Sequence, residues 1–349
     1  MEKIGAKETK WLLILLMLST VTLGDIAVFV SNSGTAAFIN CICGLLIALL
    51  ATLVVNLLIR HTDMFEVFTA VYGKALTSIL GFVLLAVTLM NGAQKMELFS
   101  RAISEFVLTD TPRIFILILF SVSVLSAVLF NLEAITRYAL AAGLVFLVFA
   151  GIIVFSSLSE ARYTNICPVL GKGRVVNVLN MLYVFGDVVY FYIISGYIRN
   201  RRRSAFTASK AVIGAGVITA VLTLFYTLCV PYPVSEKYTY PLYRLASLAN
   251  YTVVLQRLDG LVFLMWMFLG FISVSALTLF AVIIFARLFN LSDPRAVSPA
   301  FVFLVFLITL TGFVSEKAVN VILPAFAFGV MPLTAVLYKF KKSWRKKND

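Results

Sequence analysis

Charged residues, histidine and cysteine are all scarce in this 349-residue sequence. Only 13% of the residues are Asp, Glu, Lys or Arg, whereas 61% are apolar. A water-soluble domain carries more surface charge than this, so the composition predicts a helical membrane protein with several spans. The first apolar stretch, 11–30, is long enough to span a bilayer and no small-residue cleavage site follows it. We therefore expect a retained helix there rather than a signal peptide.

The single histidine and the four cysteines leave little scope for a metal or redox site. One histidine, His61, cannot build the multi-histidine centre of the common intramembrane metalloenzymes. Cys167 and Cys229 fall near one predicted membrane face and could pair, but free thiols that act as small apolar residues are the simpler interpretation. No nucleophile–base pair stands out either. We expect no metal, no cofactor and no enzymatic activity.

Acidic residues are few as well, 16 against 29 Lys and Arg, for a formal net charge of +13. Such an excess can indicate nucleic-acid binding, but these basic residues lie in short predicted loops and in the C-terminal tail. Cytoplasmic segments of membrane proteins are enriched in Lys and Arg, so the distribution indicates membrane topology instead. It predicts that both termini are cytoplasmic and that nucleic acid is not a partner. Lys95 is left near the outer end of the third apolar stretch.

Ten apolar stretches follow one another along the chain, and each can form a membrane helix. They cover 11–30, 36–59, 75–98, 114–131, 138–158, 175–198, 209–230, 258–286, 299–314 and 319–338. Ten spans divide into two halves of five, and an odd number of spans per half inverts the second half. We expect one all-α transmembrane domain, residues 1–349, built from inverted repeats at about 10–160 and about 172–340.

Two semi-polar stretches support the inverted arrangement. Residues 64–75 follow the second span and residues 240–251 follow the seventh, and both carry apolar side chains at helical spacing. Each is interpreted as a short amphipathic helix at a membrane interface, and a plain connecting loop is the alternative. Inverted repeats would place the two helices on opposite faces of the membrane.

A glycine–aspartate pair occurs inside the first apolar stretch, at Gly24 and Asp25, and again inside the sixth, at Gly186 and Asp187. A carboxylate at bilayer depth costs roughly 2.5–3.5 kcal/mol on insertion scales, so both aspartates should face protein or water. Glycine weakens a helix and admits a close neighbour. Interrupted helices at corresponding places in two halves are typical of a secondary-transporter binding site. Two unrelated dipeptides on interface-facing helices are the alternative.

Several short motifs occur in a distinctive order along the chain. The sequence Y-P-L-Y-R-L at 240–245 precedes Q-R-L-D at 256–259 and then Trp266; T-P at 111–112 precedes the fourth span, E-A-I-T-R at 133–137 precedes the fifth, and F-G-D at 185–187 lies in the sixth. Together they resemble the spore germination permeases, the B subunits of endospore germinant receptors within the amino acid–polyamine–organocation superfamily. The first helix departs from the family pattern, because it has no proline after Gly24.

The resemblance implies a leucine-transporter-like fold in which the first and sixth helices unwind around a small ligand. It also implies a sensory role in the inner membrane of a bacterial spore, beside other germinant-receptor subunits. The chain would bind a small nutrient, most simply an amino acid, and trigger germination. The alternative is an H⁺- or Na⁺-coupled secondary transporter of amino acids or related small molecules, which the two intramembrane aspartates on their own would favour.

An unwound helix frees N–H groups at one half-helix end and C=O groups at the other, a pair that suits a zwitterionic ligand. The expected ligand-binding residues lie on the first, third, sixth and eighth spans: Ser19, Thr20, Thr22, Gly24, Asp25, Asn91, Tyr183, Phe185, Gly186, Asp187, Trp266 and Ser273. For the hydroxyl groups of the first span the alternative is a bond back to their own helix. For Asn91 the alternative to ligand binding is a hydrogen bond that only holds two helices together. For Trp266 the alternative is a position at the membrane interface.

Overall fold

The computed structural model describes residues 3–59, 64–170, 177–199, 206–248, 259–291 and 293–348, without the side chains of 177–180, 259 and 343–348. Within these ranges the chain is helical and forms no β-sheet, although an isolated parallel bridge joins Ile4 to Ile198. His61 and Arg257, which the sequence analysis considered, lie outside the described residues, as does the side chain of Asp259.

Within the described residues, each predicted apolar stretch lies mainly on helix. The spanning elements in chain order are α1 (Ala6–Thr20), η1 (Val21–Asp25), α2 (Ile26–Ser33), α3 (Ala37–Leu58), α4 (Met64–Phe106), α5 (Arg113–Leu129), α6 (Asn131–Ser157), η5 (Asn177–Val188), α7 (Val189–Ile194), α9 (Thr207–Cys229), α11 (Asp259–Leu288), α12 (Ser298–Thr311), α13 (Glu316–Pro324), η9 (Ala325–Val330) and α14 (Met331–Asn348). The connections between them include η2 (Gly34–Ala36), η3 (Leu158–Glu160), η4 (Tyr163–Ile166), η6 (Ser195–Tyr197), η7 (Val234–Lys237), α10 (Pro241–Leu248) and η8 (Pro294–Val297).

Among the described residues, seven helical stretches are long and apolar enough to cross a membrane. The first, Ala6–Leu58, contains the first two predicted spans, and the shorter apolar helices Arg113–Leu129 and Met181–Tyr197 correspond to the fourth and sixth. The prediction of an all-helical membrane protein is confirmed. The count of ten crossings and the repeat boundaries remain predictions.

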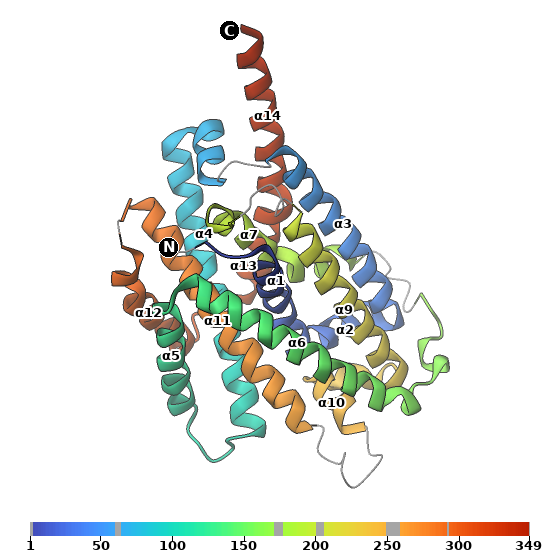
Figure 1. The fold of residues 1–349 in the computed structure, drawn as a ribbon. Helices are drawn as coiled ribbons and strands as arrows, with labels where there is room; N and C mark the ends of the chain where they lie inside the picture. The colour runs from blue at the N-terminus through green and yellow to red at the C-terminus, as the bar shows by residue number, and fades with distance from the viewer. Residues whose placement is uncertain are drawn as a thin grey trace.

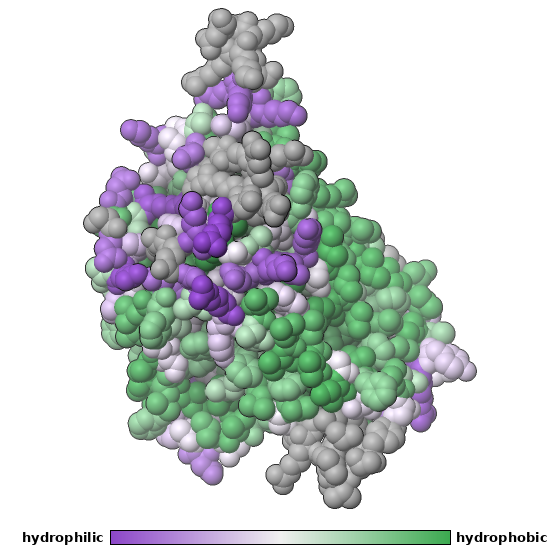
Figure 2. Space-filling view, in the orientation of Figure 1, coloured by the Kyte–Doolittle hydropathy of each residue, from purple (hydrophilic) through white to green (hydrophobic). Residues whose placement is uncertain are grey.

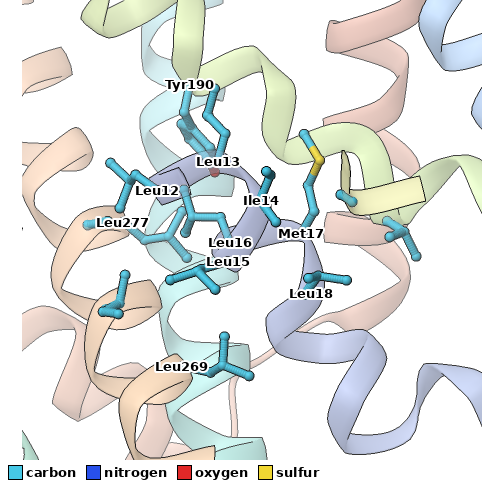
Figure 3. Packing of buried hydrophobic residues seen from close by; sticks show 14 of the residues in the cluster. Leu12, Leu13, Ile14, Leu15, Leu16, Met17, Leu18, Tyr190, Leu269 and Leu277 are labelled. Carbon is cyan, nitrogen blue, oxygen red and sulfur yellow. The ribbon is translucent and has the colours of Figure 1, made fainter. Parts of the chain in front are cut away.

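Helix α1 lies at the centre of the bundle and is buried on every side. Residues 12–19 are all buried, so no face of this part of the helix reaches the surface. A helix that is apolar all round is typical of the core of a membrane protein. Figure 3 shows its leucines beside Leu269 and Leu277 of α11 and Tyr190 of α7. These neighbours come from the third quarter of the chain and beyond, so α1 is the element around which both halves pack.

The outer helices turn large apolar side chains outward. Leu50 of α3, Leu119 of α5 and Phe155 of α6 are exposed. Figure 2 shows a broad hydrophobic side, with hydrophilic residues gathered towards the end of the molecule from which α14 projects. Lipid solvates such a surface, whereas water would not, so the surface agrees with a bundle embedded in a bilayer.

Both predicted amphipathic helices are present. Gly73, at φ 82°, separates a helix of residues 64–72 from the long span that follows it within α4. The second amphipathic helix is α10, and the two lie at opposite ends of the bundle (Figure 1). The apolar stripe of the first helix faces protein: Phe68 is buried, and the Tyr72 hydroxyl lies 3.0 Å from Thr334 Oγ1 of α14.

Candidate ligand-binding site

The first span is interrupted by a π-helical segment, η1, that ends at Asp25. The first helix was expected to unwind at this point. Instead the chain stays helical, and its α-helical geometry changes to the wider π-helical geometry over residues Val21–Asp25. No proline follows Gly24 within the span, so no N–H is lost and the backbone can remain hydrogen-bonded. Single π-turns inside α-helices are frequent at functional sites. A Cβ built on Gly24 would stand 3.6 Å from the carbonyl oxygen of Thr239, so η1 faces the segment that leads into α10.

The sixth span is interrupted over a longer distance. Residues Asn177–Val188 form the 3-10 helix η5, and α-helical geometry begins only at Val189. A 3-10 helix rarely exceeds three or four residues, and a longer stretch often marks a hinge. Gly186 lies in this segment, and a Cβ built on it would stand 3.2 Å from Leu323 Cγ and from the Pro324 nitrogen. The glycine thus permits the close approach of η5 to the end of α13.

Asp187 of η5 is fully occupied by two partners from α4. Its Oδ2 lies 2.6 Å from Lys95 Nζ, and its Oδ1 accepts a 2.8 Å hydrogen bond from Asn91 Nδ2. The Asn91 amide also contacts the Tyr190 hydroxyl at 3.3 Å. Lys95 donates a second hydrogen bond, 2.7 Å long, to the carbonyl oxygen of Leu16 in α1. We call Lys95, Asp187, Asn91 and the Leu16 carbonyl the central ion-pair cluster.

The central ion-pair cluster changes the expected role of Asp187. The lysine side chain is 2% exposed and the aspartate side chain 7%, so water screens neither charge. Removing two charges from water is costly, and the pair is stable only because both carboxylate oxygens have partners. In this arrangement each oxygen of Asp187 already has a partner, so its charge is balanced within the protein. The sequence analysis placed Asn91 and Asp187 in one site, and the structure brings them together.

Sequence reasoning missed the importance of Lys95. It treated this residue as a charge near the end of a span, although a lysine at that depth is expensive unless it is paired. Its position four residues after Asn91 was the available signal. Residues at i and i+4 share one face of a helix, so the side chains of Asn91 and Lys95 must point in the same direction.

Asp25 has one carboxylate oxygen that the described part of the protein leaves without a partner, although Thr20 and Tyr183 hydrogen-bond to the carboxyl group. Its Oδ2 is buried and has no hydrogen-bond partner in the described part of the chain. The side chains of Thr20 and Tyr183 lie beside the carboxyl group. Burying a polar atom without a partner costs free energy, and native structures rarely tolerate it without a functional reason. The carboxyl group at the end of η1 is therefore suited to a cationic group that arrives from outside the protein.

Three of the expected ligand-binding hydroxyl groups are engaged within their own helices. Ser19 Oγ donates to the Leu16 carbonyl at 2.6 Å, and Thr22 Oγ1 donates to the Ser19 carbonyl at 3.2 Å. Ser273 Oγ donates to the Leu269 carbonyl in the same way, at 2.6 Å. This is the alternative that the sequence analysis left open for the first span. Phe185 is buried in the core beside these elements.

Trp266 is buried within the protein, and it belongs to a group of rings from α4, α11, α10 and the residue before α10. We call this group the aromatic cluster; its members are Phe106, Tyr240, Tyr243, Phe263 and Trp266, with neighbouring ring centroids 4.5 to 6.5 Å apart. The indole Nε1 of Trp266 has no hydrogen-bond partner among the described residues. Because Thr239 precedes the cluster directly and faces Gly24, the cluster adjoins the π-helical segment.

Tyr240 ties the aromatic cluster to the end of α4. Its hydroxyl donates a 3.0 Å hydrogen bond to Glu105 Oε2. Burial, and after it the negative charge of Glu105, raises the pKa of Tyr240 to about 12. The phenol therefore stays protonated at any physiological pH and keeps its role as a donor.

Comparison with known proteins identifies the family. The family model described as spore germination protein matches residues 3–318. The chain belongs to this family. Among solved structures, it is similar to a Na⁺-coupled sialic acid symporter in a substrate-bound outward-open state, with a TM-score of 0.69 and 13% identity over 97% of this chain and 79% of the symporter. At that identity the likeness shows the fold alone. A comparison with curated proteins gave no match.

In this spore germination protein several of the motif residues have structural roles. Glu133 and Arg137 form an ion pair one turn apart near the start of α6, and Pro112 is the N-cap of α5. Pro241 begins α10. All four cysteines are free, so the alternative pairing of Cys167 with Cys229 does not occur. The family match and the symporter-like fold confirm the resemblance and the fold that the sequence analysis inferred.

Proposed function

We propose that this chain is the germinant-sensing membrane subunit of a spore nutrient receptor. It would bind a small nutrient, most simply an amino acid, between the interrupted first and sixth spans. Membership of the spore germination protein family over residues 3–318 carries the proposal. The receptor would reside in the inner spore membrane with both termini towards the spore core, and it would act beside other germinant-receptor subunits.

The unsatisfied polar atoms support a zwitterionic ligand. Asp25 offers a buried carboxylate oxygen without a partner, which an ammonium group would satisfy. Trp266 offers an indole N–H without a partner, which would donate to an acceptor such as a carboxylate. Asp25 suits this role better than Asp187, since both oxygens of Asp187 already have partners in Asn91 and Lys95.

Sensing requires that the ligand bind one conformation of the protein more tightly than another, because equal affinity shifts no equilibrium. The π-helical and 3-10 segments supply elements that can change geometry, since either can relax to an α-helix by exchanging hydrogen-bond partners. Thr239 lies against Gly24, so a change in the geometry of η1 would displace Thr239 and, with it, α10 and the aromatic cluster. Such a movement at one end of the bundle would pass the signal to partner subunits.

Deletion of the chain from a spore former tests the proposal. Deletion should abolish germination towards one class of nutrient, while chemical triggers that bypass the receptors still work. Re-expression of the wild-type chain should restore the nutrient response. An unchanged nutrient response in the deletion strain would contradict the proposal.

A coupled secondary transporter is the second candidate. The buried Asp25 carboxyl group, whose Oδ2 has no hydrogen-bond partner among the described residues, favours it, because a buried carboxyl group that can gain and lose a proton is a common element of proton-coupled transport. Purified protein in liposomes separates the two functions. Amino-acid uptake that follows an imposed proton or sodium gradient would favour the transporter, whereas ligand binding without uptake would favour the receptor.

A further inference from the structure

The ammonium group of Lys95 lies where separate helices converge. It contacts Asp187 Oδ2 at 2.6 Å and the Leu16 carbonyl oxygen at 2.7 Å, so one cation joins α4, η5 and α1. The side chain is 2% exposed. Leu16 is itself in the wholly buried part of α1, one turn before the π-helical segment begins.

The two oxygen atoms that contact Lys95 Nζ are of the kinds that bind hard cations. A carboxylate oxygen and a backbone carbonyl oxygen are typical ligands of such cations in proteins. An ammonium group presents three donors and a compact charge, so it can replace a metal ion in an oxygen-lined site. The site differs from a metal site in that its cation is covalently attached to the chain.

We propose that the side-chain ammonium group of Lys95 takes the place of a bound metal cation in this protein. Its ammonium occupies the oxygen-lined position between α1, α4 and η5, so the central ion-pair cluster needs no bound metal cation. Asn91 completes the arrangement, because its side-chain amide donates a hydrogen bond to Asp187 Oδ1, the oxygen that Lys95 does not contact. The carboxylate is thereby neutralised and hydrogen-bonded by α4 alone.

Removal of the Lys95 side chain should leave a site that a free cation from solution can occupy. Lys95→Ala removes atoms that correspond to n-propylammonium, and it leaves the Asp187 carboxylate and the Leu16 carbonyl in place. The variant should therefore bind n-propylammonium, and the bound cation should stabilise the folded state by an amount that grows with the logarithm of its concentration above the dissociation constant. This expectation concerns the cluster itself and holds whether the chain senses or transports.

Thermal unfolding of the purified full-length chain in detergent tests the proposal. For Lys95→Ala, n-propylammonium chloride at about 100 times its dissociation constant should raise the midpoint temperature by about 3 °C or more. Uncharged n-propanol at the same concentration should not, and the exposed-site control Lys317→Ala should show no response to n-propylammonium. The double variant Lys95→Ala with Asp187→Asn should lose the effect, because the anion is gone. No rise in Lys95→Ala, or an equal rise in the double variant, would overturn the proposal.

The wild-type protein provides a second measurement. Its midpoint temperature should be equal in sodium chloride, potassium chloride and choline chloride at one ionic strength, since the cation is already supplied by Lys95. A rise in sodium or potassium relative to choline that disappears in the double variant Lys95→Ala with Asp187→Asn would show that a free metal cation binds at this cluster, and it would overturn the proposal.

Discussion

Gly186 and Pro324 are in such close contact that a Cβ on Gly186 would stand 3.2 Å from the Pro324 nitrogen. The contact joins η5, the interrupted part of the sixth span, to the point where α13 passes into the π-helical segment η9. Proline has no N–H to donate to the preceding turn, so irregular helix at this point is expected. Two irregular segments therefore support each other, and glycine is what lets them approach.

Gly186→Ala should destabilise the protein. The added methyl group would meet Leu323 and the backbone at Pro324, and a backbone atom cannot move aside as a flexible side chain can. Overpacking of this kind costs about 1–3 kcal/mol. Gly151→Ala is the matched control, because nothing lies within 4 Å of its added Cβ and alanine is the better helix former. Thermal unfolding in detergent measures both; equal midpoints would contradict the close contact.

Replacement of one member of the ion pair should cost more than replacement of both. Lys95→Met leaves the buried Asp187 charge without its cation, which costs about 3–5 kcal/mol in comparable buried pairs. The double variant Lys95→Met with Asp187→Asn removes both charges and should recover most of that loss. Midpoint temperatures of the two single variants and the double variant give the coupling. A double variant as unstable as the sum of the single variants would show that the two side chains act independently.

The spans and the two interruptions were predictable because each depends on local sequence. Apolar stretches of sufficient length located the long helices, and Gly24 and Gly186 marked two segments of irregular geometry, whereas the π-helical segment η9 that follows Pro324 was not predicted. The bonds of Ser19 and Thr22 back to their own turn were predictable as an alternative for the same reason. The presence of an amphipathic helix before Gly73 followed from the spacing of its apolar residues.

The form of the interruptions and the partner of Asp187 were not predictable. Whether a weakened helix unwinds or widens into a π-turn depends on what packs against it, and here Thr239 meets Gly24 from far along the chain. Lys95 and Asp187 are 92 positions apart, and only the packing of α4 against η5 brings them together. The burial of Trp266 likewise depends on α10 folding over the end of α11, whereas its residue type alone favoured the interface.

Trp266→Phe should weaken the nutrient response while it lowers the stability of the folded protein only slightly. Phenylalanine keeps a ring in the aromatic cluster but removes the indole N–H that has no partner within the described chain. If this N–H donates to the ligand, its loss is worth about 0.5–1.5 kcal/mol, or roughly a twofold to tenfold higher nutrient concentration for half-maximal germination. Phe263→Leu is the control, because it removes a ring of the same cluster without changing a polar group. An equal shift in both variants would assign Trp266 to packing alone.

Asp25→Asn should abolish or strongly weaken the nutrient response while the protein remains abundant in the membrane. Asparagine has nearly the same shape, and the buried Oδ2 of Asp25 has no bonded cation in the described structure that its loss would strand. Hydrogen bonds to charged groups are worth about 1.5–3 kcal/mol, so the nutrient concentration for half-maximal germination should rise by about tenfold to a hundredfold. Asp110→Asn, which removes the same charge from an exposed loop between α4 and α5, should behave as wild type. Abundance is measured by immunoblot of spore membranes, and germination by loss of optical density across a nutrient titration. A wild-type titration curve for Asp25→Asn at normal abundance would remove this carboxylate from the ligand site, and with it the physical basis for placing the nutrient at the π-helical turn.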